Sequence, residues 1–479
     1  MPYHLNKNSI KSASFPSAFK TQMQTLLSAE EYSSFEQAYE NKASTSIRLN
    51  KAKFNNPIHL AKVPWASSGY YLEERPIFTL DPLFHAGMYY VQEASSMFLE
   101  QAFIQHIDFA SELNVLDLCA APGGKSTHIL SLINDNSLLV ANEVIKSRAY
   151  ILKENIQKWG YGNVVVTNSD PERFSDLKDF FDVMVIDAPC SGEGLFRKDE
   201  DAMKEWSPEH VLLCASRQQR IIGDVWEALK PGGILVYSTC TFNKKEDEEN
   251  LDWMLKDFEA ETLSLNLKDE WGITELRSET GGIGYKFFPH KTKGEGFFIT
   301  VLRKKDGSGN HSKTKKQKNP FTFLSRETEA YMANWLKPNA QLKKVLYGEQ
   351  VLALLSNKMD AIITLTNHLH IISCGLEMAE LKKKNSIPLP ALALSIDLNN
   401  EAFPSVNLEY KEALLFLARE NFDIELPEGD WILVNYKNCP LGWLKKINNR
   451  FNNYYPVDWR IRMNVTALTI ESEKNSLFL

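Results

Sequence analysis

The sequence predicts an α/β protein with a parallel-type central sheet, and three observations indicate this fold class. The chain has 479 residues, which corresponds to about three domains of roughly 150 residues each. Between residues 81 and 305, short β-branched runs alternate with helical periods, as in βαβ units. A lysine-rich stretch without large apolar residues follows and predicts a linker. We therefore expect a Rossmann-like central domain with further domains on either side.

The predicted elements follow the chain in order. Residues 1–80 predict an N-terminal α+β accessory region, whose most strand-like segment is SIRLNKAKF, Ser46–Phe54. The central domain, residues 81–305, then contains five β-branched runs that predict strands: Val115–Cys119, Leu138–Glu143, Val164–Thr167, Val183–Asp187 and Ile234–Cys240. Buried parallel strands have this apolar character because helices cover both faces of the sheet.

Helices and a hairpin complete the central domain. The period of Lys146–Trp159 brings four apolar residues near one helical face: Ala149, Ile151, Leu152 and Ile156. Another helix is expected over Leu251–Phe258, because the acidic cluster Glu246–Glu249 before it favours a helix start. Tyr285–Leu302 predicts a terminal antiparallel hairpin.

The part of the chain after the central domain divides at a basic segment. Within Arg303–Pro320, seven Lys or Arg residues face one acid, so this segment cannot form a core. We predict a basic linker at residues 306–320, an intermediate accessory domain at 321–397 and a C-terminal domain at 398–479.

Composition and charge exclude several classes of protein. Hydrophobic residues make up 43% and charged residues 24%, which excludes a wholly disordered chain. The net charge of −7 means that nucleic-acid binding must come from local basic patches. Six scattered cysteines without a CxxC pair argue against a zinc ribbon and a disulfide framework, so no metal is predicted. Without a signal peptide or an apolar stretch of membrane-spanning length, we expect a cytoplasmic protein with no membrane contact.

The strongest local motif is VLDLCAAPGGKST, Val115–Thr127. An apolar strand ends in a glycine-rich turn that opens a helix, which places free backbone N–H groups beside a ligand. The spacing matches neither a P-loop nor GxGxxG. Glu143, about 20 residues later at the next strand end, could accept hydrogen bonds from both ribose hydroxyls. Together these features predict an adenosine-containing cofactor. An ordinary strand-to-helix turn is the alternative.

Polar residues at two later strand ends predict a second part of the site. Asp187 and Cys190 lie in VMVIDAPCSGEG, and Cys240 ends ILVYSTC. Because ligands bind outside the carboxyl ends of parallel strands, all three should reach the same edge. A single such cysteine is more often a small core residue. Two of them, beside an acid and a cofactor loop, favour catalysis.

The C-terminal segment Gly442–Arg462 interleaves basic and aromatic residues. This combination suits RNA, since cations attract phosphates and aromatic rings stack on bases. The residues that we expect to bind RNA are Lys445, Lys446, Arg450, Tyr454 and Arg460. The alternative is an edge hairpin with solvated charges over a small aromatic core.

The motifs CAAPGGKS, DAPCSGEGLFRKD, YSTC and PHKTKGEGFF, in this order, resemble the Nop/Sun family of S-adenosylmethionine-dependent RNA cytosine-C5 methyltransferases. Phe84–Phe98 also resembles the lead-in to that family's catalytic domain, and the chain is most similar to the bacterial RsmF branch. The resemblance is dense over residues 84–303, weak over the first 80 and modest beyond 320. It implies a class I methyltransferase domain, a PUA-like RNA-binding domain at the C-terminus and an RNA-binding role for residues 1–80.

The resemblance also implies roles for single residues. The cofactor S-adenosylmethionine would be held by the loop Cys119, Ala120, Ala121, Pro122, Gly123, Gly124 and Lys125, by Glu143 at the ribose, by Asp170 at the adenine amino group, and by Asp187. Cys240 corresponds to the nucleophile, Cys190 to the cysteine that helps release the product, and Asp187 also to the acid at the target base. Lys125 would approach the target base as well.

The chemistry explains why a cysteine is needed. Carbon 5 of cytosine is a poor nucleophile until a thiolate adds to carbon 6. The implied substrate is ribosomal RNA of the small subunit, within a ribosomal subunit or its precursor, and the implied enzyme is a monomer. The alternatives are a tRNA cytosine-C5 methyltransferase, a DNA cytosine methyltransferase with Cys190 as the nucleophile, and a non-catalytic RNA-binding assembly factor.

Overall fold

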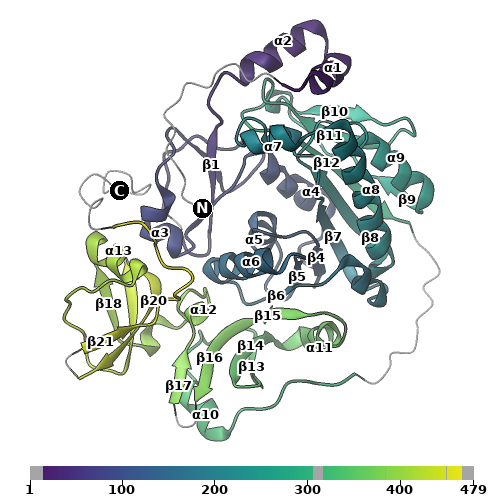
Figure 1. Ribbon diagram of the computed structural model, residues 1–479. Coiled ribbons are helices and arrows are strands. Elements are labelled where there is room, and N and C mark those ends of the chain that lie inside the picture. The colour runs from purple at the N-terminus through teal and green to yellow at the C-terminus, as the bar shows by residue number, and fades with distance from the viewer. Residues whose placement is uncertain (1–14, 55, 306–316, 383–384, 449, 466–479) are drawn as a thin grey trace.

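The computed structural model describes residues 15–54, 56–305, 317–382, 385–448 and 450–465. Most of the predicted basic linker, and the last 14 residues of the predicted C-terminal domain, lie outside these described residues. Figure 1 shows a large central sheet in teal, with the N-terminal helices at one end and two smaller sheets of the C-terminal half at the other.

The central sheet has ten strands among the described residues, in the order β10-β11-β12-β8-β7-β4-β5-β6-β15, with β9 beside β12. Its parallel strands are β4 (Asn114–Asp117), β5 (Leu138–Asn142), β6 (Val164–Thr167), β7 (Phe181–Asp187) and β8 (Leu229–Thr239). Its antiparallel strands are β9 (Ala260–Thr262), β10 (Thr274–Arg277), β11 (Ile283–Phe287), β12 (Phe297–Lys304) and β15 (Ile371–Cys374). The predicted fold class, including the terminal hairpin of β11 and β12, is confirmed.

Helices cover the sheet as the apolar patterns require. They are α4 (Leu99–His106), α5 (Gly124–Leu130), α6 (Lys146–Trp159), α8 (Pro208–Val225) and α9 (Glu248–Asp257). The short helix α7 (Glu200–Glu205) instead packs through Ala202 and Met203 against the apolar cluster of α1 and α2. Helix α6 has the predicted bounds and ends at Gly160, whose φ of 92° favours glycine. The prediction for Ile151 was wrong, because this side chain is 49% exposed. Ala149, Leu152 and Ile156 are buried, since their spacing of three and four residues puts them on one face.

The N-terminal part contains three helices and a small sheet. They are α1 (Ser17–Leu26), α2 (Ala29–Ala38) and α3 (Pro82–His85), with the sheet order β2-β1-β3 for β1 (Thr45–Leu49), β2 (Gly69–Leu72) and β3 (Tyr89–Val91). Arg48 of β1 is fully buried. Its guanidinium donates to Thr127 Oγ1 (2.5 Å) and to Gln92 Oε1 (2.8 Å), and lies 4.4 Å from the Trp159 ring centroid. This side chain therefore joins the N-terminal sheet to α5 and α6.

The C-terminal half forms two further sheets among the described residues. The first contains β13 (Leu342–Tyr347), β14 (Gln350–Leu355), β16 (Leu376–Lys382) and β17 (Asn385–Pro388), with α10 (Arg326–Tyr331), α11 (Met359–His368) and α12 (Pro390–Ala393). The second contains β18 (Ser405–Leu408), β19 (Trp431–Tyr436), β20 (Cys439–Ile447) and β21 (Arg450–Asn453), with α13 (Tyr410–Ala418).

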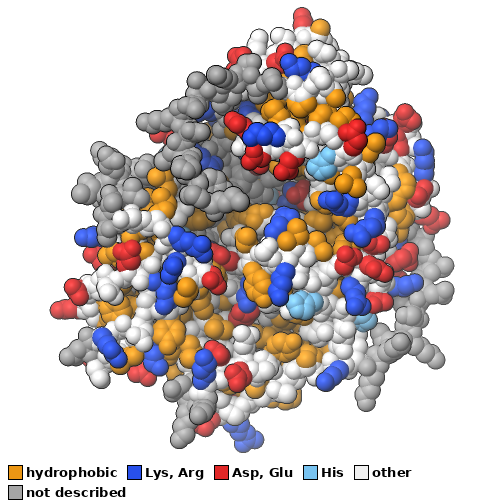
Figure 2. Space-filling model, in the orientation of Figure 1, with side chains coloured by type: hydrophobic (Ala, Val, Ile, Leu, Met, Phe, Trp, Pro, Cys, Tyr) orange, Lys and Arg blue, Asp and Glu red, His pale blue; other side chains and the backbone are white. Residues whose placement is uncertain are grey.

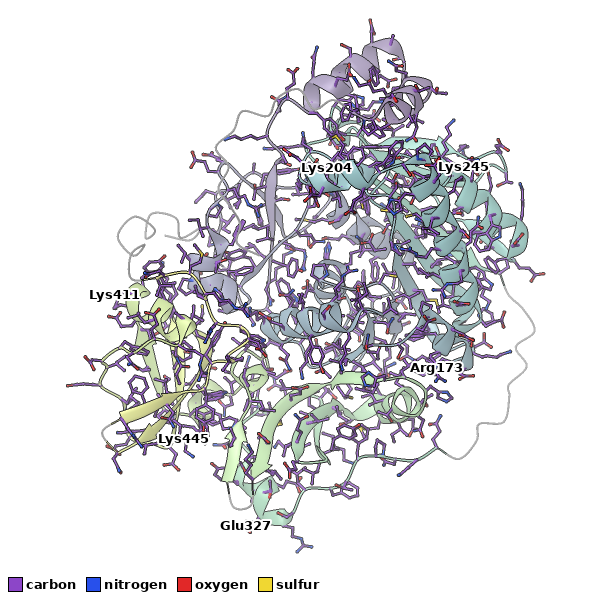
Figure 3. All side chains as sticks on the ribbon, in the orientation of Figure 1. Arg173, Lys204, Lys245, Glu327, Lys411 and Lys445 are labelled. Carbon is purple, nitrogen blue, oxygen red and sulfur yellow. The ribbon has the colours of Figure 1, made fainter. Side chains whose placement is uncertain are left out.

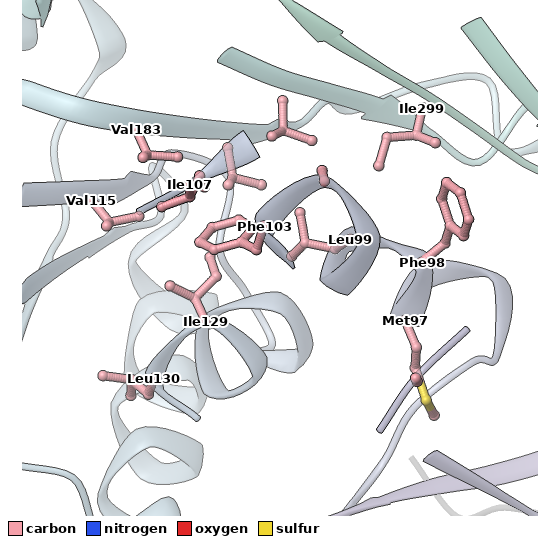
Figure 4. Close-up of a cluster of buried hydrophobic side chains, with 14 of the residues drawn as sticks. Met97, Phe98, Leu99, Phe103, Ile107, Val115, Ile129, Leu130, Val183 and Ile299 are labelled. Atoms are coloured by element: carbon pink, nitrogen blue, oxygen red, sulfur yellow. The ribbon is translucent and has the colours of Figure 1, made fainter. Parts of the chain in front are cut away.

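The main core lies on both faces of the central sheet. Figure 4 shows one part, where Phe103 of α4 and Ile129 of α5 meet beneath Val115 of β4 and Val183 of β7. All four side chains are at most 2% exposed. This packing holds the strand ends in fixed relative positions. No helix within the described ranges is both long and apolar enough to cross a membrane.

Candidate active site

The predicted cofactor loop lies between β4 and α5 and is held by its neighbours. Ala120 N donates to Asn142 O (2.8 Å), Arg148 donates to Ala121 O (2.8 Å) and Asn155 Nδ2 donates to Pro122 O (2.8 Å). Gly123 has a φ of 114°, a conformation in which a side chain would be strained. Burial raises the pKa of the Cys119 thiol, so its side chain stays protonated. The loop can therefore contact a ligand mainly through its backbone.

The two predicted cofactor carboxylates lie at the ends of adjacent strands. Glu143 follows β5, is 3% exposed, and accepts from Ile145 N (2.9 Å). Asp170 follows β6, is exposed, and accepts from Glu172 N (3.1 Å). Two residues that sequence reasoning missed, Val144 and Ile145, are 54% and 49% exposed. They place apolar surface beside Glu143, as the wall of a site for an adenine ring requires.

The predicted cysteines meet at the ends of β7 and β8. Cys190 Sγ and Cys240 Sγ are 3.0 Å apart, and Cys240 N donates to Cys190 Sγ (3.3 Å). Both thiols are free. The hydrogen bond with Cys240 and then burial raise the pKa of Cys190 well above its usual value. A protonated Cys190 can therefore donate to the Cys240 sulfur.

Asp187 and Lys125 form an ion pair beside the cysteines. Lys125 Nζ is 2.7 Å from Asp187 Oδ2, and Ser238 Oγ donates to Asp187 Oδ1 (2.8 Å). Asp187 lies three residues before Cys190, and Ser238 two residues before Cys240. The structure thus brings the cofactor loop, the ion pair and both thiols to the same edge of the sheet.

Comparison with known proteins assigns the chain to a family. A family model described as 16S rRNA methyltransferase RsmB/F matches residues 105–303. The curated ribosomal RNA small subunit methyltransferase F of Pectobacterium atrosepticum is 30% identical over 471 residues, covering 93% of this chain and 96% of the relative. That of Escherichia coli O7:K1 is 31% identical over 469 residues, covering 92% and 96%. The chain belongs to the RsmB/F family.

Two more models match the parts flanking the catalytic domain of this RsmB/F-family protein. The model for the N-terminal domain of 16S rRNA methyltransferase RsmF matches residues 15–94. The model for the methyltransferase RsmF PUA domain matches residues 403–461. The weak resemblance expected for the first 80 residues was therefore wrong, because that region has a family model of its own. The resemblance to the RsmF branch is confirmed, and with it an S-adenosylmethionine-dependent RNA methyltransferase activity.

Solved structures support the same fold for the RsmB/F-family chain. A methyltransferase homologue from Pyrococcus horikoshii is 29% identical with a TM-score of 0.51, covering 61% of this chain and 96% of that one. The structure of NSun6 from Pyrococcus horikoshii with SFG, an analogue of S-adenosylmethionine, also has a TM-score of 0.51. It is 20% identical and covers 61% of this chain and 99% of that one, so it supports the fold alone.

Sequence reasoning also missed Glu193, three residues after Cys190 in this RsmB/F-family site. Its side chain is fully buried, and no ion pair to it occurs within the described residues. Its carboxylate accepts from Phe242 N (3.0 Å), Trp206 Nε1 (3.0 Å), Gln22 Nε2 (3.0 Å) and Asn243 Nδ2 (3.3 Å). Gly194 N also donates to Cys240 O (2.8 Å). Glu193 therefore joins the loops of both cysteines to α1. The acid in SGEG, directly after Cys190, was the available signal.

The predicted RNA-binding residues lie on the C-terminal sheet or just after it. Arg450 and Arg460 are exposed, whereas the ring of the partly buried Tyr454 packs edge-on against Trp431 at 4.6 Å. Lys445 Nζ lies 5.2 Å from the centroid of that Trp431 ring. Lys446 Nζ is 3.4 Å from Glu428 Oε1 and donates to Pro427 O (3.1 Å). Within the described residues, the side chains of Arg450 and Arg460 make no such contact with a ring, a carboxylate or a carbonyl oxygen.

The C-terminal sheet lies away from the cysteines. Lys245 follows Cys240 by five residues and marks that side of the molecule. In Figure 3, Lys445 lies on the opposite side from Lys245. Trp443 and Tyr455 are at most 1% exposed, so these rings form core and cannot stack on bases. Figure 2 shows Lys and Arg scattered among Asp and Glu over the visible face. Within the described residues, no cluster of three His, Cys, Asp or Glu could hold a metal ion.

Proposed function

We propose that this enzyme transfers a methyl group from S-adenosylmethionine to carbon 5 of a cytosine in small-subunit ribosomal RNA, through a covalent bond between Cys240 and carbon 6. The observation that carries the proposal is the pair of free thiols 3.0 Å apart beside the Lys125–Asp187 ion pair. The curated relatives named above are small-subunit rRNA methyltransferases. A cytoplasmic monomer acting on a ribosomal subunit or its precursor is part of the proposal.

The residues at the carboxyl ends of β4, β5 and β6 fit S-adenosylmethionine. Glu143 presents a carboxylate for the ribose hydroxyls, and the exposed Asp170 one for the adenine amino group. Val144 and Ile145 offer apolar surface for the adenine ring. The loop from Cys119 to Lys125 adds backbone N–H groups at the start of α5. When bound, the cofactor supplies a methyl group on a sulfonium.

The first step needs a thiolate and a proton donor. The Cys240 thiolate adds to carbon 6 of the cytosine, and ring nitrogen 3 takes up a proton, so carbon 5 becomes nucleophilic. Asp187 is partly exposed and bonded to Lys125 Nζ, so Lys125 can supply the proton that Asp187 passes to nitrogen 3. The target base must first leave its stack, at a cost of a few kcal/mol.

Cys190 is suited to the last step. After methyl transfer, the carbon-5 proton must leave, the bond between Cys240 and carbon 6 must break to free the Cys240 thiolate, and the double bond between carbons 5 and 6 must re-form. Ring nitrogen 3 then returns its proton to Asp187. The largest cause of the raised pKa of Cys190 is its hydrogen bond with Cys240. Once Cys240 is bonded to carbon 6, its sulfur is a thioether and accepts only weakly from the Cys190 S–H. Cys190 first releases its own S–H proton to solvent, and the resulting thiolate, or a water that it orders, then accepts the carbon-5 proton.

Two alanine variants test the proposal. With labelled S-adenosylmethionine and small ribosomal subunits, Cys240→Ala should abolish methylation and form no covalent complex. Cys190→Ala should attack and transfer the methyl group but fail to eliminate, so a protein–RNA adduct should accumulate on a denaturing gel. The double variant should lose the adduct again. Circular dichroism checks that each variant folds, and mapping the modified cytosines identifies the substrate.

The reverse pattern would overturn these roles. An adduct in Cys240→Ala and none in Cys190→Ala would make Cys190 the nucleophile, as in the DNA type of mechanism. Methylation of tRNA but not of ribosomal RNA would replace the substrate. An unmodified RNA pool with a folded wild-type protein would favour the non-catalytic alternative.

A further inference from the structure

The intermediate part of the chain, by which we mean the described residues between 317 and 397, is built into the catalytic sheet. The three matched family models leave residues 304–402 uncovered. Figure 1 shows β15 of this part, in green, beside β6. The two strands are antiparallel, with Ile371 opposite Thr167 and Cys374 opposite Val165. Gly375 N also donates to Val164 O (2.8 Å). The intermediate part therefore covers the edge of the sheet that is nearest the proposed adenine end of the cofactor site.

The pairing continues beyond β6 into the loop that carries Asp170. Asn168 N donates to His370 O (2.9 Å), and His370 N donates to Ser169 Oγ (3.0 Å). Ser169 is 6% exposed, so little water can replace these bonds. Two successive residues of the loop are thus attached to the residue that precedes β15.

Further hydrogen bonds connect the same loop to the one after β5. Asn168 Nδ2 donates to Glu143 O (2.7 Å) and to Val144 O (2.9 Å). Asn142 is 1% exposed. Its side chain accepts from Ser169 N (3.0 Å) and donates to Ser169 O (3.0 Å) and Leu118 O (3.2 Å). The loops after β4, β5 and β6 therefore share one network that reaches His370.

We propose that residues 317–397 position the cofactor site, with His370 holding the loop of Asn168, Ser169 and Asp170 through Ser169 Oγ and Asn168 N. Affinity for a ligand falls when binding must first order the loops that contact it, and a loop already held avoids this cost. The intermediate part thereby sets the affinity for S-adenosylmethionine. This inference rests on the proposed function, because it takes Glu143 and Asp170 as cofactor ligands.

Two positioning variants and a matched control test this inference in the full-length protein. Ser169→Ala removes the acceptor for His370 N, and Asn168→Ala removes the bonds to Glu143 O and Val144 O. Asn357→Ala is the control, since Asn357 Nδ2 donates to Glu112 Oε2 (2.9 Å) and Asn136 O (3.0 Å), before the starts of β4 and β5. It therefore breaks a contact with the same intermediate part at the opposite end of these strands.

Calorimetry with S-adenosylhomocysteine measures the outcome. We expect Ser169→Ala and Asn168→Ala to weaken binding roughly tenfold and Asn357→Ala to leave it unchanged. In methylation assays KM should rise for S-adenosylmethionine and not for RNA, which general loss of stability would not produce.

Glu143→Ala separates the two proposals. If it leaves binding unchanged, the cofactor assignment fails. If it weakens binding while Ser169→Ala does not, only the positioning role fails, because only Ser169→Ala removes a side-chain contact with His370. Weakening by Asn357→Ala as large as that by Ser169→Ala would also overturn the positioning role.

Discussion

At the scale of single residues, Glu193 shows how a buried charge can hold a reactive site. A carboxylate without a cationic partner is costly to bury unless it is fully hydrogen-bonded. Glu193 meets this condition with donors from Gln22, Trp206 and the backbone of Phe242. Because Phe242 follows Cys240 by two residues, the carboxylate limits where Cys240 can lie relative to Cys190.

The variant Glu193→Gln should therefore slow catalysis. One carboxylate oxygen of Glu193 would be replaced by an N–H₂ group, which cannot accept the hydrogen bond that the oxygen accepts. A buried donor would then be left unpaired, at a cost of about 1–3 kcal/mol. We expect single-turnover methylation to fall roughly tenfold or more, with unchanged affinity for S-adenosylhomocysteine. Gln22→Ala, which removes a partner from α1, should have a smaller effect. A folded Glu193→Gln variant with the wild-type rate would contradict this role.

At the scale of elements, β1 is attached to the catalytic domain through Arg48. Burial lowers the pKa of this guanidinium to about 9. The planar side chain combines hydrogen bonds to Thr127 and Gln92 with a cation–π contact to Trp159. No other side chain type supplies this geometry.

Arg48→Ala should destabilise the protein by on the order of 3 kcal/mol, because charged hydrogen bonds are lost and polar groups are left buried. Urea unfolding followed by circular dichroism measures this change. Arg48→Lys retains the charge but not the planar fork, so it should recover only part of the loss. Equal stability of Arg48→Ala and wild type would refute the attachment.

The C-terminal sheet leads to a second prediction at this scale. Arg450 and Arg460 are exposed, whereas Lys446 already contacts Glu428 and Pro427. The double variant Arg450→Ala, Arg460→Ala should lower RNA affinity and make it less dependent on salt. The slope of the logarithm of the binding constant against the logarithm of salt concentration should become shallower by roughly 0.7 for each lost phosphate contact. Lys446→Ala should change the slope less. RNA titrations at several salt concentrations measure the slope. A wild-type slope in the arginine variant would contradict the prediction.

At the scale of the whole molecule, buried acids make stability depend on pH. Burial raises the pKa of Asp117 and of Glu246 to about 7. In the unfolded chain these groups have pKa values of about 4. Between these values the native state binds protons that the unfolded state lacks, so the contribution of both groups to the free energy of unfolding falls as pH rises.

Asp117→Asn removes one of these groups without changing its shape. We expect the free energy of unfolding of this variant to fall less steeply than that of wild type between about pH 4 and 7. Its stability relative to wild type should therefore increase towards pH 8. Denaturant unfolding across this range measures the slopes. Asp108→Asn, at an exposed position, should leave the slope in this range unchanged. Parallel curves for Asp117→Asn and wild type would contradict the prediction.

Local patterns predicted much of the catalytic domain. The bounds of α6 and the hairpin of β11 and β12 follow from periods that lie within a few consecutive residues. The meeting of Cys190 and Cys240 follows from the rule that parallel strands end at one edge. These features depend on short stretches of chain, so the sequence by itself determined them. The sequence motifs also determined the family.

Only the tertiary structure decided the contacts between distant segments. The pairing of β15 with β6 joins residues about 200 positions apart, and Gln22 reaches Glu193 over 171 positions. The exposure of Ile151 depends on which face of α6 meets the sheet. The ion pair of Lys446 depends on the neighbouring loop, which carries Glu428. Such contacts form when whole elements pack, and their partners leave no periodic signal in the local sequence.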